Sequence, residues 1–286
     1  MRGVSRILAI VDTRKENHLA LDRATQLAKA SGAHLHILAP NPKPDDASIQ
    51  YLEAVADKID SQGVETTIHE VWKEDLTETI IHVRQVERCH LVVKDYKPEG
   101  GILSTFSTPN DWNLLRRCRV PVLLVRHNRP WNGANMLAAI NADPEDANHQ
   151  LLNQAILENA SQTARLFDAP LKIASAHPTT MLALQDKGNG ITSVDSYIQV
   201  CRHLASEFDL PEEAIKVRPG PADTMIPDLC REISVELLIM GTQARTGIPA
   251  IALGNTAEQI ISDIDTDLLV VQPKHHMIPL ERELEQ

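Results

Sequence analysis

Short runs of consecutive apolar residues alternate along the chain with longer stretches in which apolar residues recur at helical spacing. The apolar runs do not alternate with polar residues, a pattern typical of strands buried on both faces of a parallel sheet. Residues 19–28 and 52–59 show the three- and four-residue spacing of amphipathic helices. The pattern predicts an α/β fold of strand–helix–strand units with right-handed crossovers.

The same order of elements occurs twice. Four pairs of apolar segments correspond: RILAIVD (6–12) with NMLAAIN (135–141), HLHILAP (34–40) with LKIASAH (171–177), HLVVKD (90–95) with ELLIMG (236–241), and VPVLLV (120–125) with TDLLVV (266–271). The last two pairs share one offset of 146 residues, so the segment between them aligns without a gap. We interpret the chain as a tandem duplication with five strands in each half. The halves, residues 1–130 and 131–286, meet near residues 128–135, where Pro, Gly and Asn are typical of a linker.

Composition agrees with two globular domains and excludes several classes of protein. Hydrophobic residues make up 43% of the 286 residues and aromatic residues only 3%, so Leu, Ile, Val and Ala must form the cores. No stretch approaches the ~20 apolar residues of a membrane span, and the first residues become charged too soon for a signal peptide. The four cysteines are scattered without a CxxC pair, so we expect a cytoplasmic protein with reduced, buried thiols.

Charge is distributed unevenly between the halves. Residues 1–130 carry 18 Lys and Arg against 17 Asp and Glu, whereas residues 131–286 carry 10 against 22. Phosphate contacts need Lys and Arg, so the acidic half argues against a broad nucleic-acid surface. We interpret the excess of acid as a solvated face.

The main candidate for a binding site follows the fourth strand of the second half, because ligands of open parallel sheets bind beyond the carboxyl ends of the strands. Gly241, Gly247 and Gly254 permit a tight turn, and Asn255 with Glu258 has the spacing of a helix capping box. Free N–H groups at such a helix start favour an anion or a phosphate. A glycine turn followed by an ordinary helix cap explains the same residues equally well.

The order of these residues resembles the universal stress protein family, in its tandem-domain E-type branch. ATP-binding members carry a glycine, two residues, a glycine, nine residues and then Gly-Ser or Gly-Thr after strand 4, with an Asp at the end of strand 1. Gly241 and Gly254 fit the first and third glycines, and residues 245–247 fit the usual continuation. Ala244 replaces the second glycine, and Asn255 stands where the family has Ser or Thr.

The resemblance implies, in each half, a doubly wound sheet of five parallel strands in the order 3-2-1-4-5, the fold of the adenine nucleotide alpha hydrolase-like proteins. It implies ATP, another adenine nucleotide or a nucleotide-linked metabolite as a phosphorylated ligand of the second half. The residues expected at this site are Asn141, Ala174, Ser175 and Ala176 at the base and ribose, and Met240, Gly241, Ala244, Arg245, Gly247, Gly254, Asn255 and Thr256 around the phosphates. The methyl group of Ala244 disfavours a left-handed turn by ~1–2 kcal/mol.

The first half has lost this glycine loop. Asp95 stands opposite Gly241, and Pro109, which has no N–H donor, stands opposite Asn255. Asp12 keeps the acidic position after strand 1. We interpret residues 1–130 as a structural or partner-binding copy.

Two histidines raise the question of a metal. His34 and His36 stand two apart on a predicted strand, so they project from one face and form half of a possible zinc site. Histidines satisfied by solvent or a neighbouring helix are the more ordinary interpretation, so no metal is predicted.

Three functions are compatible with the sequence. The first is a cytoplasmic stress protein that binds a nucleotide-like ligand in its second half and supports it, or a partner, with the first. The second is a scaffold without a ligand, and the third is a weak ATPase, although no nucleophile–base pair is evident. The apolar fifth strand of each half would be an exposed sheet edge, so we expect the two edges to pair within the chain as a pseudo-dimer, with a homodimer also possible.

Overall fold

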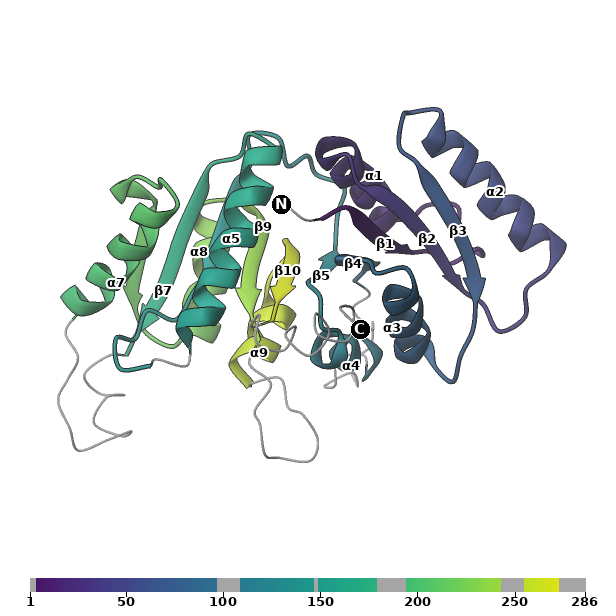
Figure 1. Cartoon of the computed structure of the whole chain (residues 1–286). Helices are drawn as coiled ribbons and strands as arrows, with labels where there is room; N and C mark the ends of the chain where they lie inside the picture. The colour runs from purple at the N-terminus through teal and green to yellow at the C-terminus, as the bar shows by residue number, and fades with distance from the viewer. Residues whose placement is uncertain (1–3, 97–108, 147–148, 179–193, 243–254, 273–286) are drawn as a thin grey trace, which may run out of the picture. The chain divides into compact units, whose positions relative to one another are not determined.

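The computed structural model describes residues 4–96, 109–146, 149–178, 194–242 and 255–272. The chain divides into two compact units, Met1–Arg129 and Pro130–Gln286 (Figure 1). Each unit alternates strands with helices and is described here by itself.

The N-terminal unit holds five parallel strands in the order β3-β2-β1-β4-β5. Its elements are β1 (Arg6–Ile10), α1 (Leu19–Ser31), β2 (His34–Pro40), α2 (Asp46–Asp60), β3 (Thr66–Val71), α3 (Leu76–Val86), β4 (Leu91–Asp95), α4 (Pro109–Arg117) and β5 (Val122–Val125).

The C-terminal unit repeats this topology with the strand order β10-β9-β6-β7-β8. Its elements are β6 (Asn135–Ala139), α5 (Gln150–Leu166), β7 (Leu171–His177), α7 (Val194–Glu207), β8 (Ile215–Pro219), α8 (Ala222–Glu232), β9 (Val235–Gly241), α9 (Asn255–Asp263) and β10 (Asp267–Val271). The predicted fold, two doubly wound sheets of order 3-2-1-4-5, is confirmed.

Helices cover both faces of each sheet, which is why the strands are apolar without alternation. In the N-terminal unit α1 packs on β1 and β4, whereas α3 and α4 contact each other on the other face. In the C-terminal unit α5 packs on β6 and β9, and α8 contacts α9. Residues 7–9 of β1 and 237–239 of β9 have no exposed surface at all.

Local capping fixes where two helices of the N-terminal unit begin. Asp45 precedes α2, and its side chain accepts a hydrogen bond from the N–H of Ser48, whose hydroxyl in turn accepts one from the N–H of Asp45. Asp75 caps α3 by accepting from the N–H of Glu78 at 2.8 Å.

The described helices and cysteines agree with the compositional predictions. No helix in the described ranges is both long and apolar enough to cross a membrane. All four cysteines are buried and free of disulfides, as expected. Burial raises the pKa of Cys89, Cys201 and Cys230 to about 12, so these thiols stay protonated.

The topology brings the ends of two strands together in each unit. β1 lies beside β4, with Ile7 opposite Leu91, and β6 lies beside β9, with Ala139 opposite Met240. The connections that leave these two neighbouring strands run to opposite sides of the sheet. A crevice therefore opens beyond the carboxyl ends of the two strands. The two crevices are the places to look for a ligand.

Candidate ligand sites in the two units

The larger cavity lies in the N-terminal unit and has a volume of about 830 Å³. Pocket volumes of about 300–1,000 Å³ are usual for small-molecule ligands. Residues that follow β1, β2 and β4 line it, together with the starts of α2 and α3 and Trp72, which is 40% exposed. Its apolar wall consists of Ile10, Val11, Ala39, Pro40, Pro42, Ala47 and Leu76.

Asp12 stands at the mouth of this cavity, directly after β1. Its carboxylate accepts two hydrogen bonds from the guanidinium of Arg14, at 2.8 Å from Nε and 3.1 Å from Nη2. The carboxylate raises the pKa of Arg14, first through these hydrogen bonds and then through its charge. Because the Arg14 side chain is 88% exposed, a ligand can replace it without uncovering a buried charge.

The end of β4 supplies a second polar group, and its function is to hold a helix. Asp95 accepts a hydrogen bond of 2.6 Å from the backbone N–H of Ala20, in the first turn of α1. A carboxylate at this position satisfies a free N–H and interacts favourably with the helix dipole. Asp95 is therefore occupied in binding the protein's own helix, a role that the sequence alignment with Gly241 does not reveal.

A buried ion pair completes the lining. The ammonium of Lys94 lies 2.7 Å from Oδ1 of Asp111, and both side chains are almost wholly buried. The same ammonium donates to the backbone carbonyl of Asp95 at 3.0 Å. The cavity is lined by four acids, Asp12, Asp45, Asp95 and Asp111, and by three bases, Arg14, Lys43 and Lys94. This balance does not favour a bare polyphosphate; it suits a ligand that presents hydrogen-bond donors and an apolar surface.

The corresponding crevice of the C-terminal unit is smaller, with a volume of about 160 Å³. Of the residues predicted for a nucleotide site, the described ones that line it are Asn141, Ala176, Met240, Gly241 and Thr256. The fold thus brings these five together from β6, β7, β9 and α9.

Leu152 of α5 occupies the space in front of Gly241. A Cβ atom built on Gly241 would lie 2.5 Å from Cδ1 of Leu152, which is closer than real Cβ contacts. Leu152 is 3% exposed. Gly241 therefore permits close packing of a helix side chain on the end of β9, a structural reason for a glycine that needs no ligand.

Asn141 already has partners inside the protein. Its Oδ1 accepts from the N–H of Asp143 at 3.1 Å, and its Nδ2 lies 3.2 Å from Oδ2 of Asp146 and 3.3 Å from Nδ1 of His149. Asn153 holds its backbone through both the N–H and the carbonyl. A nucleotide would have to displace part of this network to use the Asn141 carboxamide.

Acidic residues stand beside the C-terminal crevice. The pKa of Tyr197 is raised to about 12, first by burial, then by the carboxylate of Asp143, which also shares a hydrogen bond with it, and last by Glu145 and Asp146. The same negative potential opposes a phosphate group.

The sequences and structures of known proteins decide the family. The sequence signature of the universal stress protein family matches residues 3–126 and again 135–272. The chain belongs to the universal stress protein family. As a member of this family the protein is assigned to the stress response.

Curated relatives named universal stress protein E match most or nearly all of the chain. The chain is 26% identical to the universal stress protein E of Escherichia coli K12, over 98% of both chains. It is 31% identical to a universal stress protein E homologue of Haemophilus influenzae, over 76% of this chain and 73% of the relative. A crystal structure of a putative universal stress protein from Pseudomonas aeruginosa superposes with a TM-score of 0.84 at 30% identity, covering 100% of this chain and 99% of the other.

The other residues predicted for the family's nucleotide site are placed differently or lie outside the described ranges. Ala174 and Ser175 are buried within the sheet, and Ser175 Oγ accepts from the N–H of Ala142 at 3.1 Å. They are not among the described residues that line the crevice. Ala244, Arg245, Gly247 and Gly254 lie outside the described residues, and of Asn255 only its place at the start of α9 is described.

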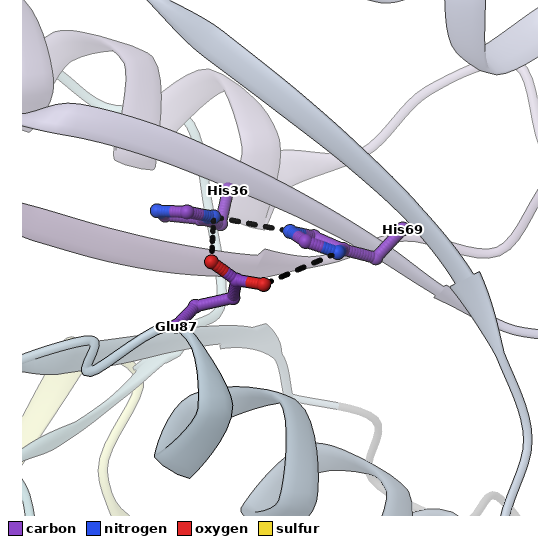
Figure 2. A group of neighbouring side chains, drawn as sticks. All are labelled: His36, His69 and Glu87. Atoms are coloured by element: carbon purple, nitrogen blue, oxygen red, sulfur yellow. Dashed lines mark hydrogen bonds and ion pairs between the residues drawn. The ribbon is translucent and has the colours of Figure 1, made fainter.

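Sequence reasoning missed two features of this universal stress protein. The large cavity of the N-terminal unit is not indicated by the glycine loop, since its lining comes from the ends of β1, β2 and β4 and the starts of α2 and α3. The second feature is a cluster of His36, His69 and Glu87 (Figure 2). Only His36 had been singled out, together with His34. The strand order implied by the family already places β2 beside β3. The missing information was the register of this pair and the position of Glu87 at the end of α3, which a single sequence does not reveal.

Proposed function

We propose that this universal stress protein acts by binding a small organic ligand in the cavity of its N-terminal unit. The observation that carries the proposal is the cavity itself, whose volume of about 830 Å³ fits a ligand of nucleoside size, whereas the C-terminal crevice measures about 160 Å³. Its position beyond β1 and β4 is the usual ligand position in an open parallel sheet.

The lining suggests the ligand's chemistry. Trp72 and the apolar wall suit a planar or hydrophobic group. Asp12 suits hydroxyl or amino groups that donate hydrogen bonds, and its exposed partner Arg14 is free to swing toward a single anionic group. A nucleoside or nucleoside monophosphate meets these demands better than a triphosphate, because four acids line the cavity.

A second candidate is the nucleotide-like site of the C-terminal unit. It is supported by the convergence of Asn141, Ala176, Met240, Gly241 and Thr256 on one crevice. It requires Leu152 to move away from Gly241 and the Asn141 carboxamide to exchange partners. For this reason we rank it after the N-terminal cavity.

Binding, and not turnover, is the activity we propose. Of the described histidines, His149 lines the C-terminal crevice, and its Nδ1 lies 2.5 Å from Asp146 Oδ2 and 3.3 Å from Asn141 Nδ2. Its partners are thus an acid and an amide, and no hydroxyl or thiol nucleophile pairs with it in the described part of the chain. Phosphate release from ATP by the purified protein, above that of a Gly254→Trp variant, would instead support a weak ATPase.

Matched tryptophan substitutions distinguish the two sites. Ala47 and Thr256 are both exposed and line the N-terminal and the C-terminal cavity, respectively. Thermal shift is measured with adenosine, AMP, ADP, ATP and nucleotide sugars on the unmodified chain, Ala47→Trp and Thr256→Trp. Linkage predicts about 2.7 kcal/mol of stabilisation at a hundredfold excess over Kd.

We expect the stabilisation in the unmodified chain and in Thr256→Trp, and its loss in Ala47→Trp. The reverse result would assign the ligand to the C-terminal crevice. Absence of any shift in the unmodified chain would contradict ligand binding by these compounds and favour a scaffold.

A further inference from the structure

Three side chains of ligand type converge in the N-terminal unit, away from the cavity. Figure 2 shows His36 and His69 on neighbouring strands, with the Glu87 carboxylate reaching up between the two rings. His36 Nδ1 lies 3.0 Å from His69 Nε2 and 3.7 Å from Glu87 Oε2, and His69 Nδ1 lies 4.0 Å from Glu87 Oε1. One nitrogen or oxygen atom from each residue lies within 4.8 Å of the others.

The fold explains why residues so far apart in sequence meet. Parallel pairing of β2 with β3 places His36 opposite Thr67 and Leu38 opposite His69, so the two histidines are diagonal neighbours on one face of the sheet. Glu87 directly follows α3 on that face, and its N–H still bonds the carbonyl of Val83 at 2.9 Å. Three rigid elements therefore hold the cluster.

The backbone of Glu87 is also fixed from the strand side. The guanidinium of Arg6 donates to the Glu87 carbonyl at 3.0 Å. The carboxylate is thus presented from an anchored position. It keeps moderate exposure, with 28% of the side chain accessible, whereas the His36 side chain is 5% exposed and that of His69 14%.

The imidazoles are in the protonation state that a metal requires. Burial, followed by the charges of His34, His69 and Arg6, lowers the pKa of His36 to about 4. Burial lowers the pKa of His69 as well, against the opposing effect of Glu87. Both rings are neutral at pH 7, so an incoming cation does not have to displace a proton from a charged imidazolium.

Hydrogen bonding within the cluster does not satisfy all of its groups. Nε2 of His36 is buried and has no hydrogen-bond partner in the part of the chain that the structure describes. This nitrogen is on the side of the ring away from Glu87, whereas Nδ1 of the same ring faces His69 and Glu87 and is the atom that the cluster offers to an ion (Figure 2).

We propose that His36, His69 and Glu87 form a binding site for one divalent first-row transition ion, with Zn²⁺ the best fit. Two imidazoles and one carboxylate are the protein ligands of tetrahedral zinc sites in which the fourth position is open to water or another ligand. Ligand atoms on one tetrahedral ion with bonds of ~2.0–2.2 Å lie about 3.3–3.5 Å apart. The distance of 3.0 Å from His36 Nδ1 to His69 Nε2 is below this value, and that of 3.7 Å from His36 Nδ1 to Glu87 Oε2 is above it. With all three ligand atoms within 4.8 Å of one another, rotation of the side chains is needed to bring them onto one ion.

The site is distinct from the ligand cavity. His36 is the third residue of β2, whereas the cavity uses Ala39 and Pro40 at the end of that strand. A bound ion would join β2, β3 and the end of α3, and it would stabilise the N-terminal unit against opening. The inference does not depend on the proposed function of the cavity.

The test is metal titration of the full chain. Because His275 and His276 are adjacent in the sequence and offer a competing site, both are replaced by Ala in every protein compared. The metal-free protein is titrated with Zn²⁺ in a calorimeter and with Co²⁺ in the visible range, where tetrahedral coordination gives strong d–d absorption. His69→Gln and Glu87→Gln remove ligands, and His34→Gln is the matched control, because His34 lies on the same strand and face but outside the cluster.

We expect one Zn²⁺ per chain, the tetrahedral Co²⁺ spectrum, and affinity reduced more than about 10-fold in His69→Gln and Glu87→Gln, since loss of a mere supporting partner already costs 10–100-fold. His34→Gln should bind as the background protein does. Circular dichroism of each variant confirms that it is folded before its affinity is compared. Absence of stoichiometric binding, or equal loss in His34→Gln, would overturn the proposal, as would unchanged affinity in Glu87→Gln.

Discussion

The two crevices occupy the same topological position but have been filled in different ways. In the N-terminal unit the strand β4 ends in Asp95, whose carboxylate bonds the first turn of α1. In the C-terminal unit β9 ends in Gly241, and Leu152 of α5 packs into the space that a side chain would have taken. In the N-terminal unit the hydrogen bond between Asp95 and Ala20, which we call the polar tether, leaves a large cavity. In the C-terminal unit the Leu152 side chain fills part of the crevice, which is therefore small.

The comparison teaches that a motif glycine does not by itself make a pocket. Gly241 satisfies the family pattern, yet it serves helix packing, whereas the unit without the glycine pattern holds about 830 Å³ of space. What determines the space is how the first helix of each unit contacts the end of the fourth strand, through a backbone N–H in the N-terminal unit and through the Leu152 side chain in the C-terminal unit. Three substitutions test this explanation, and a fourth compares the two units at β2 and β7.

The largest effect on folding stability is expected from Leu152→Ala. Removing a fully buried leucine side chain costs about 2–5 kcal/mol, depending on how far the site collapses. The same change opens the C-terminal crevice in front of Gly241, so ATP or AMP should now stabilise this unit. Hydrogen exchange of the β9 amides, with and without nucleotide, measures both effects. Loss of stability without any nucleotide effect would show that Leu152 alone does not block the site.

A smaller loss of folding stability is expected from Gly241→Ala. The added methyl would lie 2.5 Å from Leu152 Cδ1, and overpacking of this kind costs about 1–3 kcal/mol. The double variant with Leu152→Ala should cost clearly less than the sum of the two single changes, because the clash is relieved. Strict additivity in denaturant unfolding would contradict the direct contact.

The hydrogen bond of Asp95 to α1 in the N-terminal unit should contribute less to folding stability. Asp95→Ala removes the acceptor of the Ala20 N–H, and loss of such a cap costs typically ~1 kcal/mol. Exchange of the α1 amides should accelerate while that of α5 is unchanged. Asp75→Ala, which removes the cap of α3, is the matched control and should leave α1 unaffected. An effect of Asp95→Ala on both units equally would argue against a local tether.

The smallest effect at neutral pH is expected from His36→Ile, which copies the aligned residue Ile173 of the second half. The pKa of His36 is lowered to about 4 in the folded chain, from an unfolded value near 6.5. The unfolded state therefore binds the extra proton first, so stability is fully present above pH ~6.5 and is lost as the pH falls toward 4. His36→Ile should reduce this loss in the N-terminal unit. Hydrogen exchange of β2 between pH 7 and 4, with β7 as the internal reference, measures it, and an unchanged pH dependence would exclude His36 as its source.

How far the sequence could go is clear from particular residues. The uninterrupted apolar runs and the duplicated order of segments were enough to predict five strands in each unit, because burial on both faces leaves a one-dimensional signal. The order of the strands in the sheet came from the resemblance to the family. The convergence of Asn141, Met240, Gly241 and Thr256 also followed from the position of strand ends. The pairing of the two edge strands within the chain stays a prediction.

The rest depended on contacts between elements. Nothing in the spacing of Leu152 and Gly241, or of His36, His69 and Glu87, shows that they touch. Their meeting depends on strand register and on the angle at which a helix crosses the sheet.

By itself, therefore, the sequence determined the duplication and the α/β class through the apolar runs along the chain, and the family and the strand order through the resemblance of its motif residues. Only the tertiary structure decided which crevice is open and which ligand-type side chains meet, because these depend on side-chain volume and register between segments that are distant in sequence.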